Sequence, residues 1–382
     1  MIYLDNAATT RTHSEVVEAM LPYFTSKYGN LSSVYSSGSA GRKAINEARR
    51  SVAEVIGAKP EEIYFTSGGS EADNWALKAV AEGYLHKGRH IITTKIEHHA
   101  ILRTCQYLET QGFEVTYLDV DREGMVDPKQ LKEAMRQDTI LVSVMAANNE
   151  IGTMEPIGEI GRITRERGVL FHTDAVQAFG HVPICVEELG IDLLSASAHK
   201  LNGPKGVGML YIRAGVKTGA LIHGGGQERE KRAGTENVPG IVGFGAAARR
   251  AVENMERAAG RERELRDYLI RRIEKEIPDC RLNGHREKRL PNNVNFSFPV
   301  LEGESLVIML DMKGICASSG SACASGAEDP SHVLLAIGLK QEEAKGSLRL
   351  TLSEENTKEE MDYVADTLKQ IVTKLRKISY IS

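Results

Sequence analysis

The sequence has little of what would set it apart from ordinary globular proteins. Five of its 382 residues are cysteines, with no CxxC pair, so we expect neither a disulfide framework nor a cysteine zinc site. No apolar run is long enough to span a membrane, and the first residues lack the pattern of a secretory signal. A net charge of -4 with both signs mixed gives no electrostatic case for nucleic acid. We therefore expect a cytoplasmic protein that binds neither membranes nor nucleic acid directly.

The middle of the chain alternates between two hydrophobic patterns. Apolar runs typical of buried strands occur at 63–66, 91–96, 115–120, 140–146, 169–172, 193–196 and 209–212. Amphipathic stretches typical of helices occur between several of them, at 74–85, 101–111, 128–135 and 157–167. Strand–helix alternation predicts an α/β fold, in which helices cover both faces of a mostly parallel, seven-stranded sheet. A ligand is then expected beyond the carboxyl ends of the strands.

The two ends of the chain have a different pattern. Helices are predicted at 15–24 and 42–56, with a Ser/Gly-rich loop at 29–39 between them. A long charged helix at 244–277 leads to strands at 293–298, 315–317 and 348–352 and helices at 305–312 and 358–375. We expect a large domain at 15–245 and a smaller α+β domain formed by 1–14 and 246–382.

A basic pair, His199-Lys200, follows the buried strand 193–196 and precedes a turn rich in glycine. A lysine in a short turn between two core strands has its stem in apolar surroundings, and desolvation disfavours the ammonium form, as a Schiff-base lysine requires. The alternative is a lysine at a strand end whose ammonium group reaches solvent.

Three further strand ends carry polar groups. Thr66-Ser67-Gly68-Gly69-Ser70-Glu71 precedes a helix, and its amides and hydroxyls favour a phosphate, although many helix N-caps look similar. Asp174 requires a cationic partner such as a protonated ring nitrogen, unless it only caps a helix. His98 can stack on a planar cofactor, or it belongs to a solvent-facing histidine pair. Together with Lys200, these groups meet the requirements of pyridoxal 5′-phosphate.

The chain resembles the cysteine desulfurases of the NifS/IscS kind, within the fold-type I, aspartate aminotransferase-like pyridoxal-phosphate enzymes. The resemblance covers essentially the whole length and rests on motifs at 3–10, 29–30, 66–71, 97–98, 148–152, 174–177, 197–200, 224–229, 232–237, 319–323 and 347–350. Motifs of this number, in this order, make chance agreement improbable.

The resemblance implies a role for each site residue. Lys200 would bind the cofactor as a Schiff base, and His98 would stack on its ring. Asp174 would pair with the ring nitrogen, and Gln177 would bond the phenolic oxygen. The phosphate would be held by Gly69, Ser70, Ser197 and His199, joined by Thr235 from the neighbouring subunit of a homodimer. The substrate carboxylate would be held by Asn149 and Arg349, whose planar guanidinium suits a carboxylate. No metal is expected.

Cys323 lies in a segment, 317–326, that consists almost entirely of small residues. Such a segment buries little apolar area, so we expect a mobile loop whose thiol moves between the active site and an outside acceptor. A buried structural cysteine is the usual alternative, and it describes Cys316 better. The loop resembles that of the IscS-like class, whose members generally pass sulfur to protein partners. The Arg-x-Gly-His segment of the other class is not found.

The reaction implied is the conversion of L-cysteine to L-alanine, with the sulfur transferred to Cys323 as a persulfide. Lys200 would remove the α-proton, and His98 would carry a proton between substrate thiol and product. The persulfide would pass to an iron–sulfur scaffold or to a tRNA-thiolation or cofactor pathway. Two rivals are an aminotransferase or selenocysteine lyase of the same fold, and a sulfur-carrier or partner-binding protein with a vestigial cofactor site.

Overall fold

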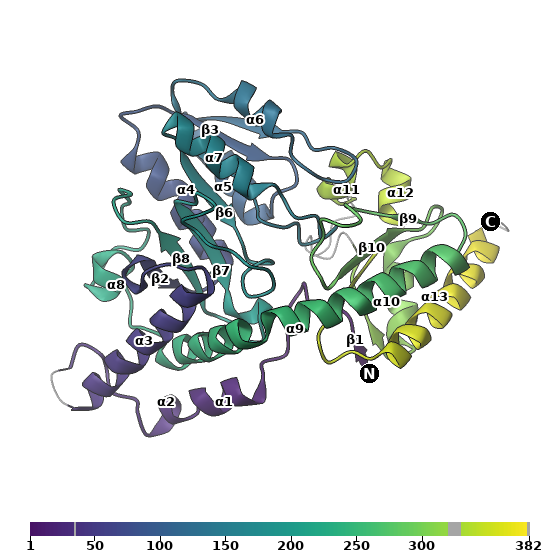
Figure 1. Ribbon diagram of the computed structural model, residues 1–382, viewed down its shortest axis with the longest axis horizontal. Helices are drawn as coiled ribbons and strands as arrows, with labels where there is room; N and C mark the ends of the chain where they lie inside the picture. Colours follow the sequence, from purple (N-terminus) through teal and green to yellow (C-terminus); the bar gives the residue numbers. More distant parts are fainter. Residues whose placement is uncertain (34–35, 320–329, 380–382) are drawn as a thin grey trace.

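The computed structural model describes residues 1–33, 36–319 and 330–379, so Cys323 lies outside the described residues. Its largest element is a seven-stranded sheet with the strand order β2-β8-β7-β6-β5-β3-β4 (Figure 1). The strands are β2 (Ile63–Thr66), β3 (His90–Thr94), β4 (Glu114–Leu118), β5 (Thr139–Ser143), β6 (Leu170–Asp174), β7 (Leu193–Ser197) and β8 (Gly208–Ile212). All neighbours are parallel except β8, which is antiparallel to both β2 and β7. The predicted α/β class and mostly parallel sheet are confirmed.

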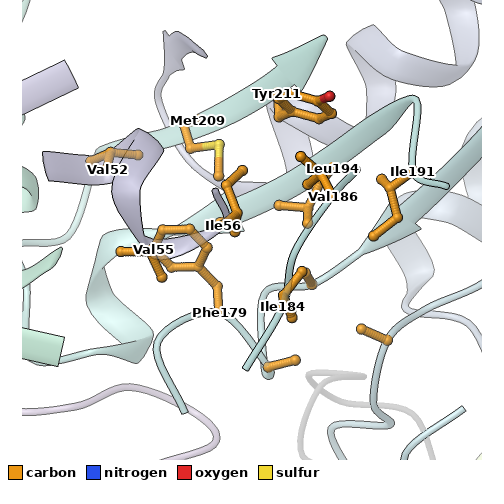
Figure 2. Packing of buried hydrophobic residues seen from close by; sticks show 14 of the residues in the cluster. Val52, Val55, Ile56, Phe179, Ile184, Val186, Ile191, Leu194, Met209 and Tyr211 are labelled. Atoms are coloured by element: carbon orange, nitrogen blue, oxygen red, sulfur yellow. The ribbon is translucent and has the colours of Figure 1, made fainter. Parts of the chain in front are cut away.

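Both faces of this sheet are covered by helices, which explains why its strands are nearly continuous apolar runs. Every residue of β3, β5, β6, β7 and β8 is buried. Successive residues point to opposite faces, so Leu193 packs with helices α4 (Gly69–Gly83) and α5 (His99–Thr110), whereas Leu194 packs with α3 (Ser36–Val55). Figure 2 shows the second face, where Val52 of α3 and Ile56, directly after this helix, pack in one cluster with Leu194 and Met209.

The second hydrophobic core forms around two small sheets. One is antiparallel, with the order β12 (Ser347–Thr351), β10 (Asn293–Ser297) and β9 (Arg281–Leu282). In the other, the N-terminal β1 (Ile2–Tyr3) runs parallel to β11 (Ile315–Cys316). Helices α10 (Gly303–Asp311) and α13 (Lys358–Ser379) supply much of this core. The N-terminal strand β1 therefore packs among elements from the C-terminal part of the sequence.

Helix α9 (Val238–Glu276) runs along both cores (Figure 1). Its beginning packs into the first core through Ile241 and Phe244, and its end packs into the second through Leu265 and Leu269. The sequence predicted a domain boundary between residues 245 and 246. That boundary stays a prediction, because the continuous helix α9 crosses it.

The remaining elements are short or lie at the edges. They are α1 (Ser14–Met20), α2 (Pro22–Thr25), η1 (Pro60–Glu62), α6 (Pro128–Ala134), α7 (Ile157–Arg167), η2 (Ala198–Lys200), α8 (Gln227–Glu230), α11 (His332–Ala336) and α12 (Gln341–Lys345). No helix among the described residues is both long and apolar enough to cross a membrane.

Several helix boundaries differ from the predictions, and glycine and proline account for the differences. The predicted helix at 15–24 is divided into α1 and α2 at Pro22. Helix α9 begins six residues before the predicted start at 244, with Asn237 accepting a hydrogen bond from the Gly240 amide. Gly245 of this helix is required rather than tolerated, because a Cβ there would lie 2.5 Å from Ala48 Cα of α3. Helix α3 likewise begins at 36 within the predicted Ser/Gly-rich loop.

Candidate active site

The predicted lysine lies where the sequence placed it, in a short helical turn between two buried strands. Strand β7 ends at Ser197, and η2 then presents His199 and Lys200, both half-buried. The Lys200 ammonium group donates to the carbonyl oxygens of Ala7 and Ala8, the latter at 2.8 Å. Gln177 Nε2 donates to the same Ala7 oxygen at 3.0 Å. The N-terminal arm therefore brings Lys200 and Gln177 together, and Lys200 does not extend freely into solvent.

Asp174 is the last residue of β6, and it lies beside His98 and a second acid, Asp73 of α4. One ligand atom from each of these three residues lies within 4.8 Å of the other two. Asp174 is 5% exposed, and its Oδ1 accepts a hydrogen bond from the Val176 amide at 2.9 Å. Burial raises the pKa of Asp174 above its usual value, and the charges of His98 and Lys200 and the Val176 hydrogen bond oppose that rise without cancelling it. The site thus holds a buried carboxylate that a cationic ring nitrogen would stabilise.

Asp73 differs from Asp174 in its surroundings. It is 1% exposed, and its Oδ1 has no hydrogen-bond partner among the described residues. Burial and the neighbouring charge of Asp174 raise the pKa of Asp73 well above its usual value. Nearby His172 cannot neutralise Asp73, because burial lowers the pKa of this histidine to about 3. Burial thus raises the pKa of both acids, and only at Asp174 do the charges of His98 and Lys200 oppose that rise.

The predicted phosphate cradle lies at the start of α4, a helix whose N-cap residue, Gly68, makes no side-chain capping bond. A Cβ on Gly69 would lie 2.6 Å from Val176 Cγ2 and 3.8 Å from Ser197 Cβ, so this turn has no room for a side chain. Ser197 is buried and Ser70 is exposed. Backbone amides at a helix N-terminus beside hydroxyl groups form a suitable anion site, so these residues fit the phosphate of pyridoxal 5′-phosphate.

His199 and Thr235 occupy less central positions. His199 Nδ1 lies 3.1 Å from Thr9 Oγ1, and burial, with Lys200 and Lys205, lowers the pKa of His199 to about 4. A neutral imidazole can still donate one hydrogen bond to an anion. Thr235 is exposed and lines a cavity of about 240 Å³ together with Ser67. Its predicted role across a dimer interface stays a prediction.

Arg349 and Asn149 are in direct contact. Arg349 lies on β12 and is 3% exposed. Its Nη1 donates to the Asn149 carbonyl oxygen at 3.0 Å, and its Nη2 donates to Asp5 Oδ1 at 2.9 Å. The buried Arg349 Nε has no partner among the described residues. The predicted carboxylate-binding pair is therefore brought together, with donors directed into a buried region.

Sequence reasoning gave no role to several residues that belong to this site. Asp73 interrupts the apolar face formed by Ala72, Trp75 and Ala76, and an acid on such a face is a signal that could have identified it. Asp5 lies in the motif at 3–10, but its contact with Arg349 depends on tertiary structure alone. Cys316, predicted to be structural, is half-buried on β11.

Comparison with known proteins identifies relatives along the whole chain. The family model described as aminotransferase class-V matches residues 2–364. Cysteine desulfurase IscS from Dictyoglomus turgidum is 57% identical over 378 residues, which cover 99% of this chain and 96% of that protein. A solved structure named NifS-like protein has a TM-score of 0.92 at 42% identity and covers 97% of this chain and 99% of its own. SspA in complex with cysteine has a TM-score of 0.81 at 36% identity and covers 94% of this chain and 100% of its own.

Proposed function

The chain belongs to the class-V aminotransferase family and is a pyridoxal-phosphate-dependent cysteine desulfurase, and we propose on this basis that Cys323 receives the sulfur of L-cysteine. The observation that supports the chemistry most is the convergence of Lys200, Asp174 and His98 from separate strand ends. The relatives' names favour a desulfurase over an aminotransferase, a selenocysteine lyase or a carrier with a vestigial site.

Different residues of the site act on the substrate's carboxylate and on its α-carbon. Arg349 and Asn149 hold the carboxylate, and Lys200 removes the α-proton. Pyridoxal phosphate, when bound, supplies an electron sink for the charge that this proton removal leaves. Asp174 favours protonation of the ring nitrogen, because a cationic ring would stabilise its buried carboxylate together with the charges of His98 and Lys200.

Sulfur transfer balances without an external oxidant or reductant. The Cys323 thiolate attacks the sulfur of the substrate, an S–S bond forms, and the substrate's C–S bond breaks. The electron pair of that bond stays with the carbon skeleton. Its β-carbon gains a proton, its α-carbon regains the proton that Lys200 removed, and the product leaves as L-alanine. His98 is the proposed proton carrier between the substrate thiol and the product carbon.

The reach of the chain supports this role for Cys323. Ser318 is joined to Arg349 by two backbone hydrogen bonds, of 3.1 Å from its amide and 2.7 Å to its carbonyl oxygen. A fully extended peptide chain spans at most about 3.5 Å per residue, so the distance that it can cover from Ser318 to Cys323 is at most about 18 Å. A substrate held by Arg349 is within that range.

We propose a homodimer in which Thr235 completes the neighbouring subunit's phosphate site. The exposed side chains of Leu21, Phe24 and Tyr28, which are 56%, 61% and 79% accessible, provide apolar area suited to an interface.

The proposed acceptor is a protein, such as an iron–sulfur scaffold or a tRNA-thiolation enzyme. The proposed location is the cytoplasm, where thiols stay reduced.

The function is tested by replacing Lys200 and measuring both cofactor and product. Lys200→Ala is expected to lose the absorbance of the lysine-bound cofactor and to release no alanine from L-cysteine. An Asn202→Ala control at the same turn should retain both. Alanine release by Lys200→Ala at the wild-type rate would contradict the assigned role.

A second experiment identifies the sulfur acceptor. The holoenzyme is incubated with sulfur-labelled cysteine and candidate proteins, and the proteins that become labelled are identified.

A further inference from the structure

Helix α11 begins directly against two loops that carry predicted site residues. Its N-cap residue, Ser331, donates a hydrogen bond from Oγ to Glu150 Oε2 at 2.5 Å. The next residue, His332, has its Nε2 3.0 Å from the carbonyl oxygen of Glu97. A carbonyl oxygen only accepts, so this nitrogen donates. Glu97 immediately precedes His98, and Glu150 immediately follows Asn149.

The backbone of Glu150 is fixed by hydrogen bonds to three asparagine side chains. Its amide donates to Asn148 Oδ1 at 2.9 Å, and its carbonyl oxygen accepts from Asn293 Nδ2 at 3.1 Å and from Asn295 Nδ2 at 3.0 Å. The residue is 5% exposed, so its carboxyl group does not line an open site. The backbone of Glu150 is therefore fixed, and its buried carboxyl group accepts the hydrogen bond from the Ser331 hydroxyl.

The charges around Glu150 link it to substrate binding. Burial raises the pKa of Glu150 to about 7, and the Ser331 hydrogen bond and the Arg349 charge both oppose that rise. Arg349 is in turn paired with Asp5. The groups that face the carboxyl are therefore a hydroxyl from α11 and a guanidinium from β12.

Both ends of the sequence segment that contains Cys323 are thus attached beside the expected substrate carboxylate. The end at Ser318 is joined to the backbone of Arg349, and the end at Ser331 is joined to Glu150. Holding the two ends of a segment near a reaction centre raises the effective concentration of a group that the segment carries.

We propose that Glu150 and Ser331 are positioning residues for sulfur transfer, which fix the start of α11 beside the substrate and thereby favour attack by the Cys323 thiolate. This inference rests on the proposed function of Cys323. Neither residue contacts the reacting atoms, and Ser331 does not contact Arg349, so loss of the Ser331 hydroxyl should affect the sulfur-transfer step and leave the binding of cysteine unchanged.

The test compares Ser331→Ala, Ser331→Thr and Glu150→Gln in the holoenzyme. Two quantities are measured after L-cysteine is added: the change in cofactor absorbance, which reports substrate binding, and the rate at which persulfide forms on Cys323 in one turnover. Ser331→Ala is expected to slow persulfide formation about tenfold while the cysteine dependence of the absorbance change stays within about twofold. Ser331→Thr retains the hydroxyl and should restore the rate.

A matched control removes a helix N-cap elsewhere. Asp127 caps α6 by accepting a hydrogen bond from the Lys129 amide at 2.9 Å, and it is exposed. Asp127→Ala has a comparable effect on helix capping, so it should lower stability but not the persulfide rate. An equal loss of rate in Asp127→Ala and Ser331→Ala would overturn the positioning role.

The pH dependence provides a readout that simple destabilisation does not produce. The ionised carboxylate makes the stronger, charge-assisted bond to Ser331, so the ratio of the wild-type rate to the Glu150→Gln rate should increase as the pH rises past about 7. The thiolate fraction of Cys323 cancels in this ratio. A ratio that does not change with pH would contradict the proposal.

Cys323→Ser, run in parallel, separates the two possible failures. Persulfide formation by Cys323→Ser would overturn the proposed function itself. If Cys323→Ser forms none and Ser331→Ala forms it at the wild-type rate, only the positioning role fails.

Discussion

Arg349 and Asp5 form a largely buried ion pair, in which Nη2 of the guanidinium donates to Oδ1 of the carboxylate at 2.9 Å. The side chains are 4% and 21% exposed. The arginine expected to bind the substrate's carboxylate therefore already binds a carboxylate from the N-terminal arm. Substrate binding must compete with this contact, and Arg349 Nε, which has no partner in the described part of the chain, offers an additional donor to the incoming group.

Asp5→Asn is expected to lower the KM for L-cysteine by roughly three- to tenfold, because a neutral amide competes less well for the guanidinium. Arg349→Lys should raise the KM by tenfold or more, since lysine lacks the planar fork. Steady-state kinetics measure both effects. A higher KM in Asp5→Asn would show instead that Asp5 mainly orients Arg349.

The two buried acids should respond differently to the same substitution. Burial and the charge of Asp174 raise the pKa of Asp73 well above its usual value, so we expect a neutral, protonated Asp73. Asp73→Asn then replaces one neutral group with another and should change kcat by less than about threefold. Asp174→Asn removes the charge that faces the ring nitrogen and should lower kcat by about a hundredfold or more. An Asp73→Asn variant as inactive as Asp174→Asn would contradict this assignment of the proton.

Glu262 of α9 should make stability depend on pH. Burial raises the pKa of Glu262 to about 8, above its value of about 4.3 in an unfolded chain. Between these values the folded state holds a proton that the unfolded state has lost, so stability falls as the pH rises from about 4.5 to 8. Glu262→Gln should reduce that fall, giving a few kcal/mol of relative stability at pH 8.

Thermal unfolding between pH 5 and 8.5 measures this effect. The matched control is Glu264→Gln, because Glu264 lies on the same helix but is exposed. It should leave the slope of stability against pH unchanged. Equal slopes in wild type and Glu262→Gln would show that the Glu262 carboxyl is solvated in solution.

The crossing of α3 and α9 depends on Gly245. A Cβ there would lie 2.5 Å from Ala48 Cα and 2.6 Å from Ala48 Cβ, so Gly245→Ala should destabilise the protein by about 1–3 kcal/mol. Gly260 lies on the same helix, where an added Cβ would meet no atom of the described residues within 4 Å, and Gly260→Ala should stabilise by up to about 1 kcal/mol. Denaturant unfolding of the two variants compares them, and destabilisation of equal size would rule out the close approach as the cause.

The sequence predicted the main sheet well because its strands are buried on both faces. Leu193 and Leu194 enter different cores, so no alternation weakens the apolar signal. The position of the site was predicted by the same reasoning, since Asp174 and Lys200 stand where apolar runs end. Family resemblance then supplied roles that periodicity cannot give, such as that of Arg349.

The features that the sequence did not predict depend on contacts between distant segments. Nothing local indicates that Asp5 pairs with Arg349 or that Ser331 bonds Glu150. Glycines in α9 lower helix propensity, so the predicted helix started late, and tertiary packing, such as that of Gly245 against Ala48, explains why some of them are there. Local propensity describes single elements, whereas these contacts follow from how the elements pack.

The central claim is that Cys323 receives the sulfur of L-cysteine, and one labelling measurement tests it most directly. Holoenzyme is mixed with sulfur-labelled L-cysteine for one turnover and digested without reductant, and its peptides are analysed by mass spectrometry. The label should appear on the Cys323 peptide of the wild type and be absent from Cys323→Ser, which should still show the change in cofactor absorbance. Label on Cys105, Cys185, Cys280 or Cys316, or persulfide formed by Cys323→Ser, would contradict the claim.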